Sequence, residues 1–193
     1  MLLPANFTFD EAAHHYHVAG VRWPSVTEVL QPLQMLEGIP WSVLEAAAKF
    51  GTHVHQACHL FNLDQLDRKA LDPALAPYLD AWERFLLDTK AVVVASEQRV
   101  AHARYRYAGT LDVILRWNSR RVLMDYKSAA VMPRITGPQT AGYAEAVGEP
   151  RIDRAGIHLR PDGTYRVHRY NGRGDLNTFI SALNIHNWRL AGG

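Results

Sequence analysis

The chain of 193 residues is 48% hydrophobic and 21% charged, which suits one folded domain with a sizeable core and argues against disorder. Its one cysteine excludes an internal disulfide and any iron–sulfur cluster held by four cysteines of the chain. The formal charge is only +2, but the basic residues are 17 arginines and four lysines, and arginine favours bidentate contact with phosphate.

No stretch approaches the run of about eighteen apolar residues that a membrane span needs, so no membrane partner is expected. The N-terminal residues 1–6 lack the basic and then apolar pattern of a signal peptide. Together these two features predict a cytoplasmic protein.

The first part of the chain is expected to form a hairpin and then a helix. Residues 7–10 and 16–18 have the pattern of paired strands. Ser25 and Glu28 have the spacing of a capping box, in which each side chain satisfies a free backbone amide at the start of a helix. That helix is expected to end near Pro32, because proline does not continue a helix.

Two longer helices are expected before the chain changes to strands. Apolar residues recur at helical spacing over about residues 41–61, and residues 73–87 predict a further helix. The period then changes, because residues 92–94, 105–115 and 122–124 are rich in residues that favour strands. These three runs are the expected core strands.

The rest of the chain is expected to add helices and a hairpin to this sheet. The elements are a helix at about 138–147, strands near 156–159 and 165–167, and a C-terminal helix at about 175–188. This order predicts an α/β fold, with a mixed central β-sheet flanked by helices. We expect one domain over residues 1–193, with a hairpin and a mostly helical N-terminal portion (1–90) before a catalytic sheet core and C-terminal helix (91–193).

Carboxylates near the ends of the expected strands form a candidate metal site. Asp125 and Lys127 are two residues apart on a strand, so their side chains point to the same face. Asp112 lies in the neighbouring strand, and Glu97 lies at the end of a third strand-like run. Clustered carboxylates hold Mg²⁺, and a nearby cation steadies the charge that grows on phosphate during hydrolysis. The alternative interpretation is that these residues form ion pairs at strand ends or surface charges.

Five short motifs stand in an order that resembles the RecB-like exonuclease branch of the PD-(D/E)XK nuclease superfamily. They are Gly51-Thr52-His53-Val54-His55, Glu97, Gly109-Thr110-Leu111-Asp112, Asp125-Tyr126-Lys127 and Gln139-Thr140-Ala141-Gly142-Tyr143. The resemblance covers about residues 50–147 and implies a restriction-endonuclease-like core. Residues 16–27 also resemble the segment that leads into phage-encoded and mitochondrial-maintenance exonucleases of this group.

The resemblance also implies roles for individual residues. The implied ligands of Mg²⁺, for which Mn²⁺ would substitute, are His55, Asp112, Asp125, the Tyr126 backbone carbonyl and Glu97. Lys127 would position the attacking water or stabilise charge, so that the catalytic residues are Glu97, Asp112, Asp125 and Lys127. Gln139 and Tyr143 lie four apart on one helix face and would contact DNA or support the active site. Candidate contacts to the DNA backbone are Arg99, Arg104, Arg106 and Arg134.

The predicted function is a metal-dependent DNA exonuclease of phage-type recombination, replication or repair, without an iron–sulfur cluster. Its expected partners are DNA and a single-strand annealing or single-strand binding protein. One alternative is a structure- or sequence-directed endonuclease on the same core, although such proteins usually lack the histidine and the Gln-x-x-x-Tyr motif. Another alternative is a catalytically inactive DNA-binding subunit. A third alternative concerns only the identity of the metal, because His55, Cys58 and His59 have a spacing that also suits zinc.

Overall fold

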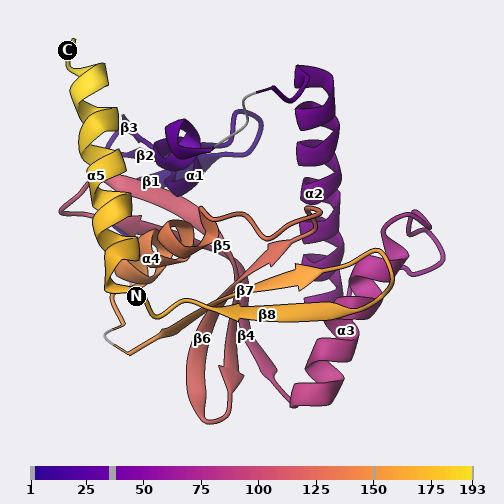
Figure 1. Cartoon of the computed structure of the whole chain (residues 1–193). Coiled ribbons are helices and arrows are strands. Elements are labelled where there is room, and N and C mark those ends of the chain that lie inside the picture. Colours follow the sequence, from indigo (N-terminus) through magenta and orange to yellow (C-terminus); the bar gives the residue numbers. More distant parts are fainter. Residues whose placement is uncertain (1–2, 35–37, 150, 193) are drawn as a thin grey trace.

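A mixed sheet of five strands forms the centre of the molecule, in a computed structural model that describes residues 3–34, 38–149 and 151–192 (Figure 1). Its strands are β4 (Val92–His102), β5 (Tyr107–Trp117), β6 (Arg120–Lys127), β7 (Asp153–Leu159) and β8 (Tyr165–Arg169). They are hydrogen bonded in the order β4-β5-β6-β7-β8, and only β6 and β7 run parallel. The helix α4 (Thr136–Val147) makes the crossover that this parallel pair requires.

Helices pack against both faces of this sheet and define two cores. On one face, α2 (Trp41–Asn62) and α3 (Ala76–Thr89) bury a cluster around Trp82, Phe85 and Tyr126. On the other face, α4 and α5 (Arg173–Leu190) bury a cluster that includes Tyr143 and Phe179. Each sheet face is therefore covered by helices, as in a three-layer α/β fold.

A smaller antiparallel sheet precedes the helices and packs against β5. It consists of β1 (Phe7–Asp10), β2 (His15–Val18) and β3 (Val21–Trp23), and is followed by α1 (Val26–Leu30) and a short 3₁₀ helix, η1 (Gln31–Leu33). The Tyr16 hydroxyl is 2.9 Å from Thr110 Oγ1, and the Ala108 amide donates to the Pro24 carbonyl at 3.0 Å. These contacts fix the start of α1 beside β5.

The α/β class, the mixed sheet and the flanking helices predicted from the sequence are confirmed. The capping box is also present, because the Ser25 hydroxyl accepts from the Glu28 amide at 3.0 Å while the Glu28 carboxylate accepts from the Ser25 amide. Among the described residues, no helix is long and apolar enough to cross a membrane.

Several expected boundaries were wrong. The strand β3 was not predicted, and β4 continues to His102, so that Glu97 lies within a strand and not at its end. The strand β5 begins at Tyr107, because residues 103–106 turn the chain between β4 and β5. The helix α3 begins at Ala76, because the Asp72 carboxylate accepts from the Ala74 amide and holds the preceding residues in a turn.

Candidate metal centre

The centre lies between α2 and the strands β4, β5 and β6, where His55 connects a helix to the sheet. His55 Nδ1 is 3.2 Å from Asp112 Oδ1, and its Nε2 is 3.0 Å from the Tyr126 carbonyl oxygen. Both neighbours are acceptors, whereas a neutral imidazole has only one N–H to donate. The imidazole must therefore be protonated, or a cation must separate one nitrogen from its neighbour.

The charge around His55 favours the protonated ring when no cation is bound. Burial opposes protonation, but the Asp112 carboxylate outweighs burial and raises the pKa of His55 above its usual value. The reverse holds for Asp112, because burial disfavours its charge but His55 and the backbone amide of Tyr126 keep its pKa below the ordinary range. The pair thus carries separated charges inside the protein.

Glu97 brings a second carboxylate to this point. One ligand atom each from His55, Glu97 and Asp112 lies within 4.8 Å of the other two, so the three could hold one metal ion. Burial first, and the neighbouring Asp112 charge second, raise the pKa of Glu97 to about 7. A bound cation would relieve this repulsion between carboxylates.

The strands are irregular where Glu97 and Asp112 face each other. Glu97 has a φ of +50°, which is unusual for a residue with a side chain, and it is absent from an otherwise continuous register of Ser96 with Val113 and Gln98 with Leu111. On β5, Leu111 packs in the α4-side core but Val113 packs in the α3-side core. Strict alternation would place both on one face, so β5 changes face at Asp112. Backbone strain of this kind is concentrated at functional sites.

Asp112 also separates two strands. The described pairing of β5 with β6 stops at Val113 and Met124, and beyond it the Tyr126 amide donates to Asp112 Oδ2 at 2.7 Å. A side chain thus replaces a ladder partner, which leaves the Tyr126 carbonyl facing His55. The sequence Asp125-Tyr126-Lys127 therefore offers a backbone oxygen at the edge of β6 that faces β5, and two charged side chains on the sheet face that α4 covers.

Asp125 and Lys127 lie on the α4 side of β6, next to this ligand group. Asp125 is only 1% exposed, and burial raises its pKa to about 6 despite the nearby Lys127 ammonium. Lys127 Nζ is 2.5 Å from Asp125 Oδ2, yet neither Asp125 oxygen accepts a well-directed hydrogen bond from any described residue. Burial would lower the pKa of Lys127, but Asp125 and Asp112 outweigh it and raise that pKa. Lys127 is therefore positively charged.

The Gln-x-x-x-Tyr motif lies on the buried side of α4. Gln139 Oε1 accepts from Lys127 Nζ at 3.1 Å, so it holds the ammonium in place. Tyr143 is buried against β5, where a Cβ at Gly109 would be 2.7 Å from its Cε1 atom. Glycine at 109 thus admits the Tyr143 ring, whereas a Cβ at Gly51 would meet only Ser128 Oγ at an ordinary 3.8 Å.

A hydrogen-bond network behind the centre joins α2, α3 and two strands. Asn62 donates to Ser96 Oγ at 3.0 Å and to the Tyr126 hydroxyl at 3.1 Å, and it accepts from Trp82 Nε1 at 2.9 Å. His59 also contacts Ser96, at 2.9 Å. The role of Asn62 was not predicted from the sequence, because a single asparagine at the end of a helix does not indicate which distant residues it contacts.

The zinc interpretation finds no support in the described part of the chain. Cys58 is fully buried in the α3-side core, and burial raises the pKa of its thiol. His59 lies beside Ser96, and the group of possible ligands around His55 contains neither residue. The three residues are close in the sequence of one helix, but their side chains do not point to one metal position.

The four arginines proposed as DNA contacts are not brought together. Arg99 pairs with Glu11 at 3.2 Å, Arg104 lies over the Tyr105 ring, and Arg106 is in the turn between β4 and β5. Arg134 lies elsewhere, in the loop between β6 and α4, where it lines a pocket. Arg99 therefore lies beside the small sheet, and of the four arginines only Arg134 shares a cavity with other basic residues.

Compared with known proteins, the sequence matches no family model and has no significant match among curated proteins. The chemistry of the site must therefore be judged from its own geometry. Two carboxylates and a histidine converge, and Asp125 adds buried oxygens without directed hydrogen-bond donors among the described residues. Buried carboxylates in this condition are usually paired or coordinate a metal. The residues thus fit a divalent cation.

Proposed function

We propose that this protein is a Mg²⁺-dependent nuclease that hydrolyses phosphodiester bonds of DNA from strand ends, on a PD-(D/E)XK core like that of restriction endonucleases. The observation that carries the proposal is the convergence of His55, Glu97 and Asp112 beside the Asp125–Lys127 pair. A cluster of buried and half-buried acids next to a half-buried, charged lysine is costly in folding and is typical of a catalytic site.

The ligand chemistry supports magnesium. Carboxylate oxygens and a backbone carbonyl are hard donors that suit Mg²⁺ or Mn²⁺, and one imidazole does not change this preference. The Tyr126 carbonyl already lies 3.0 Å from His55 Nε2, so a backbone oxygen faces the ligand group. Zinc in structural sites favours cysteine and several histidines, which these described contacts do not offer.

The protein groups around the site have distinct chemical roles. A divalent cation held there would polarise a phosphate and make water nucleophilic near neutral pH. Lys127, kept charged by Asp125 and Asp112, places a cation where negative charge grows on the phosphate oxygens. Gln139 holds the Lys127 ammonium, and the Tyr126 amide orients Asp112. His55 fixes the other oxygen of Asp112.

The test uses end-labelled single- and double-stranded linear DNA and a closed circle, with Mg²⁺, Mn²⁺ or EDTA. Wild type is compared with Lys127→Ala and Asp112→Ala, and with Lys69→Ala as a control that removes an exposed lysine outside the ligand group. We expect loss of linear but not circular DNA, abolished by EDTA and by both site variants. Removal of groups that stabilise the transition state typically costs about 100-fold or more in rate.

The other outcomes would each replace part of the proposal. Cleavage of the circle would show an endonuclease on the same core. Tight DNA binding without cleavage in either metal would show a DNA-binding subunit with an inactive centre. Equal activity of wild type and Lys127→Ala would remove Lys127 from the mechanism.

A further inference from the structure

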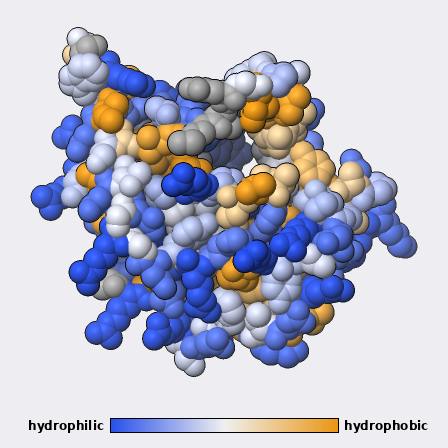
Figure 2. All heavy atoms as spheres, in the orientation of Figure 1, coloured by the Kyte–Doolittle hydropathy of each residue, from blue (hydrophilic) through white to orange (hydrophobic). Residues whose placement is uncertain are grey.

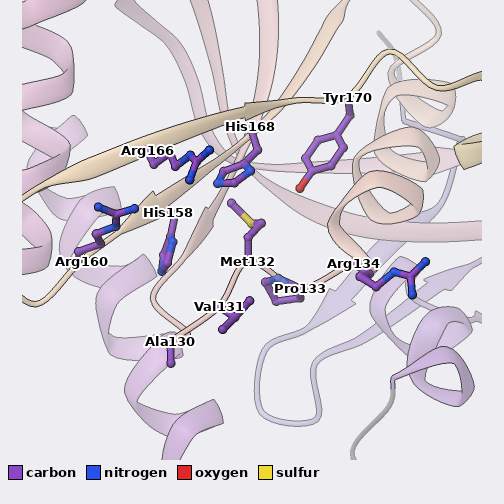
Figure 3. Close-up of a pocket in the computed structure, with 10 residues that line it drawn as sticks. All are labelled: Ala130, Val131, Met132, Pro133, Arg134, His158, Arg160, Arg166, His168 and Tyr170. Atoms are coloured by element: carbon purple, nitrogen blue, oxygen red, sulfur yellow. The ribbon is translucent and has the colours of Figure 1, made fainter.

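A pocket of about 450 Å³ opens on the sheet beyond the metal centre, between the loop that follows β6 and the strands β7 and β8 (Figure 3). Its polar lining residues are Arg134, His158, Arg160, Arg166, His168 and Tyr170. Figure 3 shows His168 and Tyr170 pointing toward Met132, with Arg160 and Arg166 on one side and Arg134 on the other. Basic side chains from two strands and one loop thus surround one space.

The register places this pocket on the sheet face that carries Asp125 and Lys127. Lys127 lies opposite His158, and His158 lies opposite Arg166. Residues opposite each other on neighbouring strands project from the same face, about 5 Å apart. Arg166 is therefore two strand spacings, about 10 Å, from Lys127 along the sheet.

The pocket is positively charged and has no acidic lining residue. Within the described ranges, Arg134, Arg160 and Arg166 form no ion pair, whereas Arg154 on β7 pairs with Asp175 at 3.0 Å. Uncompensated like charges facing one cavity repel each other, so an anion in the cavity would lower the energy. The pocket therefore differs from a surface on which carboxylates neutralise the arginines.

Two histidines also line this cavity. His158 Nε2 lies 2.6 Å from the Ala129 carbonyl and therefore donates to it, which fixes the ring. His168 Nε2 is buried and has no hydrogen-bond partner among the residues that the structure describes. Burial, and then the charges of Arg166, His158 and Arg160, lower the pKa of His168. An anionic ligand would supply the missing acceptor and oppose these charges.

We propose that this pocket binds a phosphate group of the same nucleic acid strand that is cut at the metal centre. The inference rests on the proposed function and adds a second point of contact to it. Arg160 and Arg166 present guanidinium groups, which bind phosphate through paired hydrogen bonds, and Tyr170 adds a hydroxyl at the same wall. A nucleic acid strand that lies across β6, β7 and β8 passes from the carboxylates of the metal centre to the arginines of the pocket.

The phosphate can come from two sources, a terminal monoester or an internal diester, which share this chemistry. The surface around the pocket is suited to a polar strand, because Figure 2 shows mostly hydrophilic atoms over β8. Hydrophobic atoms gather instead at the N-terminal end of α2, where Trp41 and Val43 are exposed. The two sources are separated by the ends of the oligonucleotides used as probes.

The experiment measures DNA binding by fluorescence anisotropy, with Ca²⁺ in place of Mg²⁺ and gels to verify that the DNA stays intact. The pocket variant is Arg160→Gln with Arg166→Gln, and the control is Arg116→Gln, which removes an exposed arginine of β5 outside the pocket. Oligonucleotides of one sequence carry a hydroxyl or a phosphate at either end. Circular dichroism and thermal melting verify that all variants are folded.

We expect the pocket variant to bind at least about tenfold more weakly than wild type, with a dependence of log Kd on log salt that is lower by about one to two. The Arg116→Gln control should bind like wild type. A defect confined to phosphorylated ends would identify a terminal phosphate, and an equal defect on all oligonucleotides would identify an internal one. Both results support the pocket.

Nuclease activity of wild type in Mg²⁺, measured in parallel, separates the two proposals. If wild type degrades DNA but the pocket variant keeps wild-type affinity and salt dependence, the pocket inference is overturned and the proposed function stands. If wild type neither binds nor degrades DNA, the proposed function fails and the pocket inference fails with it.

Discussion

The metal centre and the basic pocket share one sheet but are built in opposite ways. At the centre, Asp112 and Asp125 are buried and Glu97 is half-buried, and Glu97 and Asp112 lie where β4 and β5 lose regular pairing. The pocket residues come from the regularly paired strands β7 and β8, from the residues that directly follow these strands and from the loop after β6, and Arg166 is exposed. Buried acids repel one another and must be held together by other contacts, whereas the pairing register of the strands is enough to bring exposed arginines together. The comparison therefore predicts that substitutions at the centre change stability, and substitutions at the pocket mainly change binding.

The largest expected difference is between two glycines, one in each region. A Cβ at Gly109 would lie 2.7 Å from the buried Tyr143 ring, so Gly109→Ala should cost about 2–3 kcal/mol of the free energy of unfolding. A Cβ at Gly156, on β7 next to the pocket residues Met132 and Tyr170, would meet side-chain atoms of Thr136, Met132 and Tyr170 at 3.0–3.3 Å. Because these contacts are less close, Gly156→Ala should cost only about 1 kcal/mol.

Urea denaturation of the two alanine variants measures this difference. The double variant Gly109→Ala with Tyr143→Leu, which replaces the ring that the new methyl would meet, serves as the control. The methyl at position 109 should cost less in the Tyr143→Leu background than in wild type. Equal costs for Gly109→Ala and Gly156→Ala would contradict the proposed difference in packing.

The contrast between these regions also explains what the sequence could predict. Regular periods predicted most strands and helices, and the alternation of Asp125 and Lys127 placed them correctly on one face. The same alternation in His158-Leu159-Arg160 and Arg166-Val167-His168 puts the basic residues of each run on one face. It indicates the pocket only when β7 is paired with β8. Charge on both strands was visible, but only the register shows that it faces one cavity.

The irregular part of the site could not be derived from periodicity. A regular pattern gives no reason for Glu97 to adopt a positive φ, or for β5 to change face at Asp112. Tertiary contacts impose both features, because Asp112 bonds to the Tyr126 amide and to His55 from α2. Glu97 was therefore expected at the end of a strand, although the ordered motifs had included it in the site.

A smaller effect concerns the charge of Glu97 and its dependence on pH. With its pKa raised from 4.5 to about 7, the folded chain keeps a proton that the unfolded chain has already released in this interval. The free energy of unfolding therefore falls as pH rises from about 4.5 to 7, and the loss is complete above pH 7. Glu97→Gln removes this loss and should stabilise the metal-free protein at pH 8 by about 2 kcal/mol.

Urea denaturation in EDTA at pH 5 and pH 8 tests this prediction. The stabilisation by Glu97→Gln should be much smaller at pH 5, where wild type is largely protonated at this position. Arg160→Gln, which removes a charge from the pocket, should change stability little at either pH. A variant that is less stable than wild type at pH 8 would show that the Glu97 carboxylate is favourably held without a cation.

The smallest expected effect separates positioning from charge within the centre itself. Gln139→Leu removes the acceptor of the Lys127 ammonium but leaves the Asp125 contact, so Lys127 keeps its charge and loses one of its two positioning contacts. We expect kcat to fall about tenfold with little change in KM, because Gln139 acts through Lys127. Gln139→Glu, which keeps an acceptor oxygen, should recover part of kcat. A rise in KM with unchanged kcat would instead show that Gln139 binds the DNA directly, since Lys127 would then be correctly placed without it.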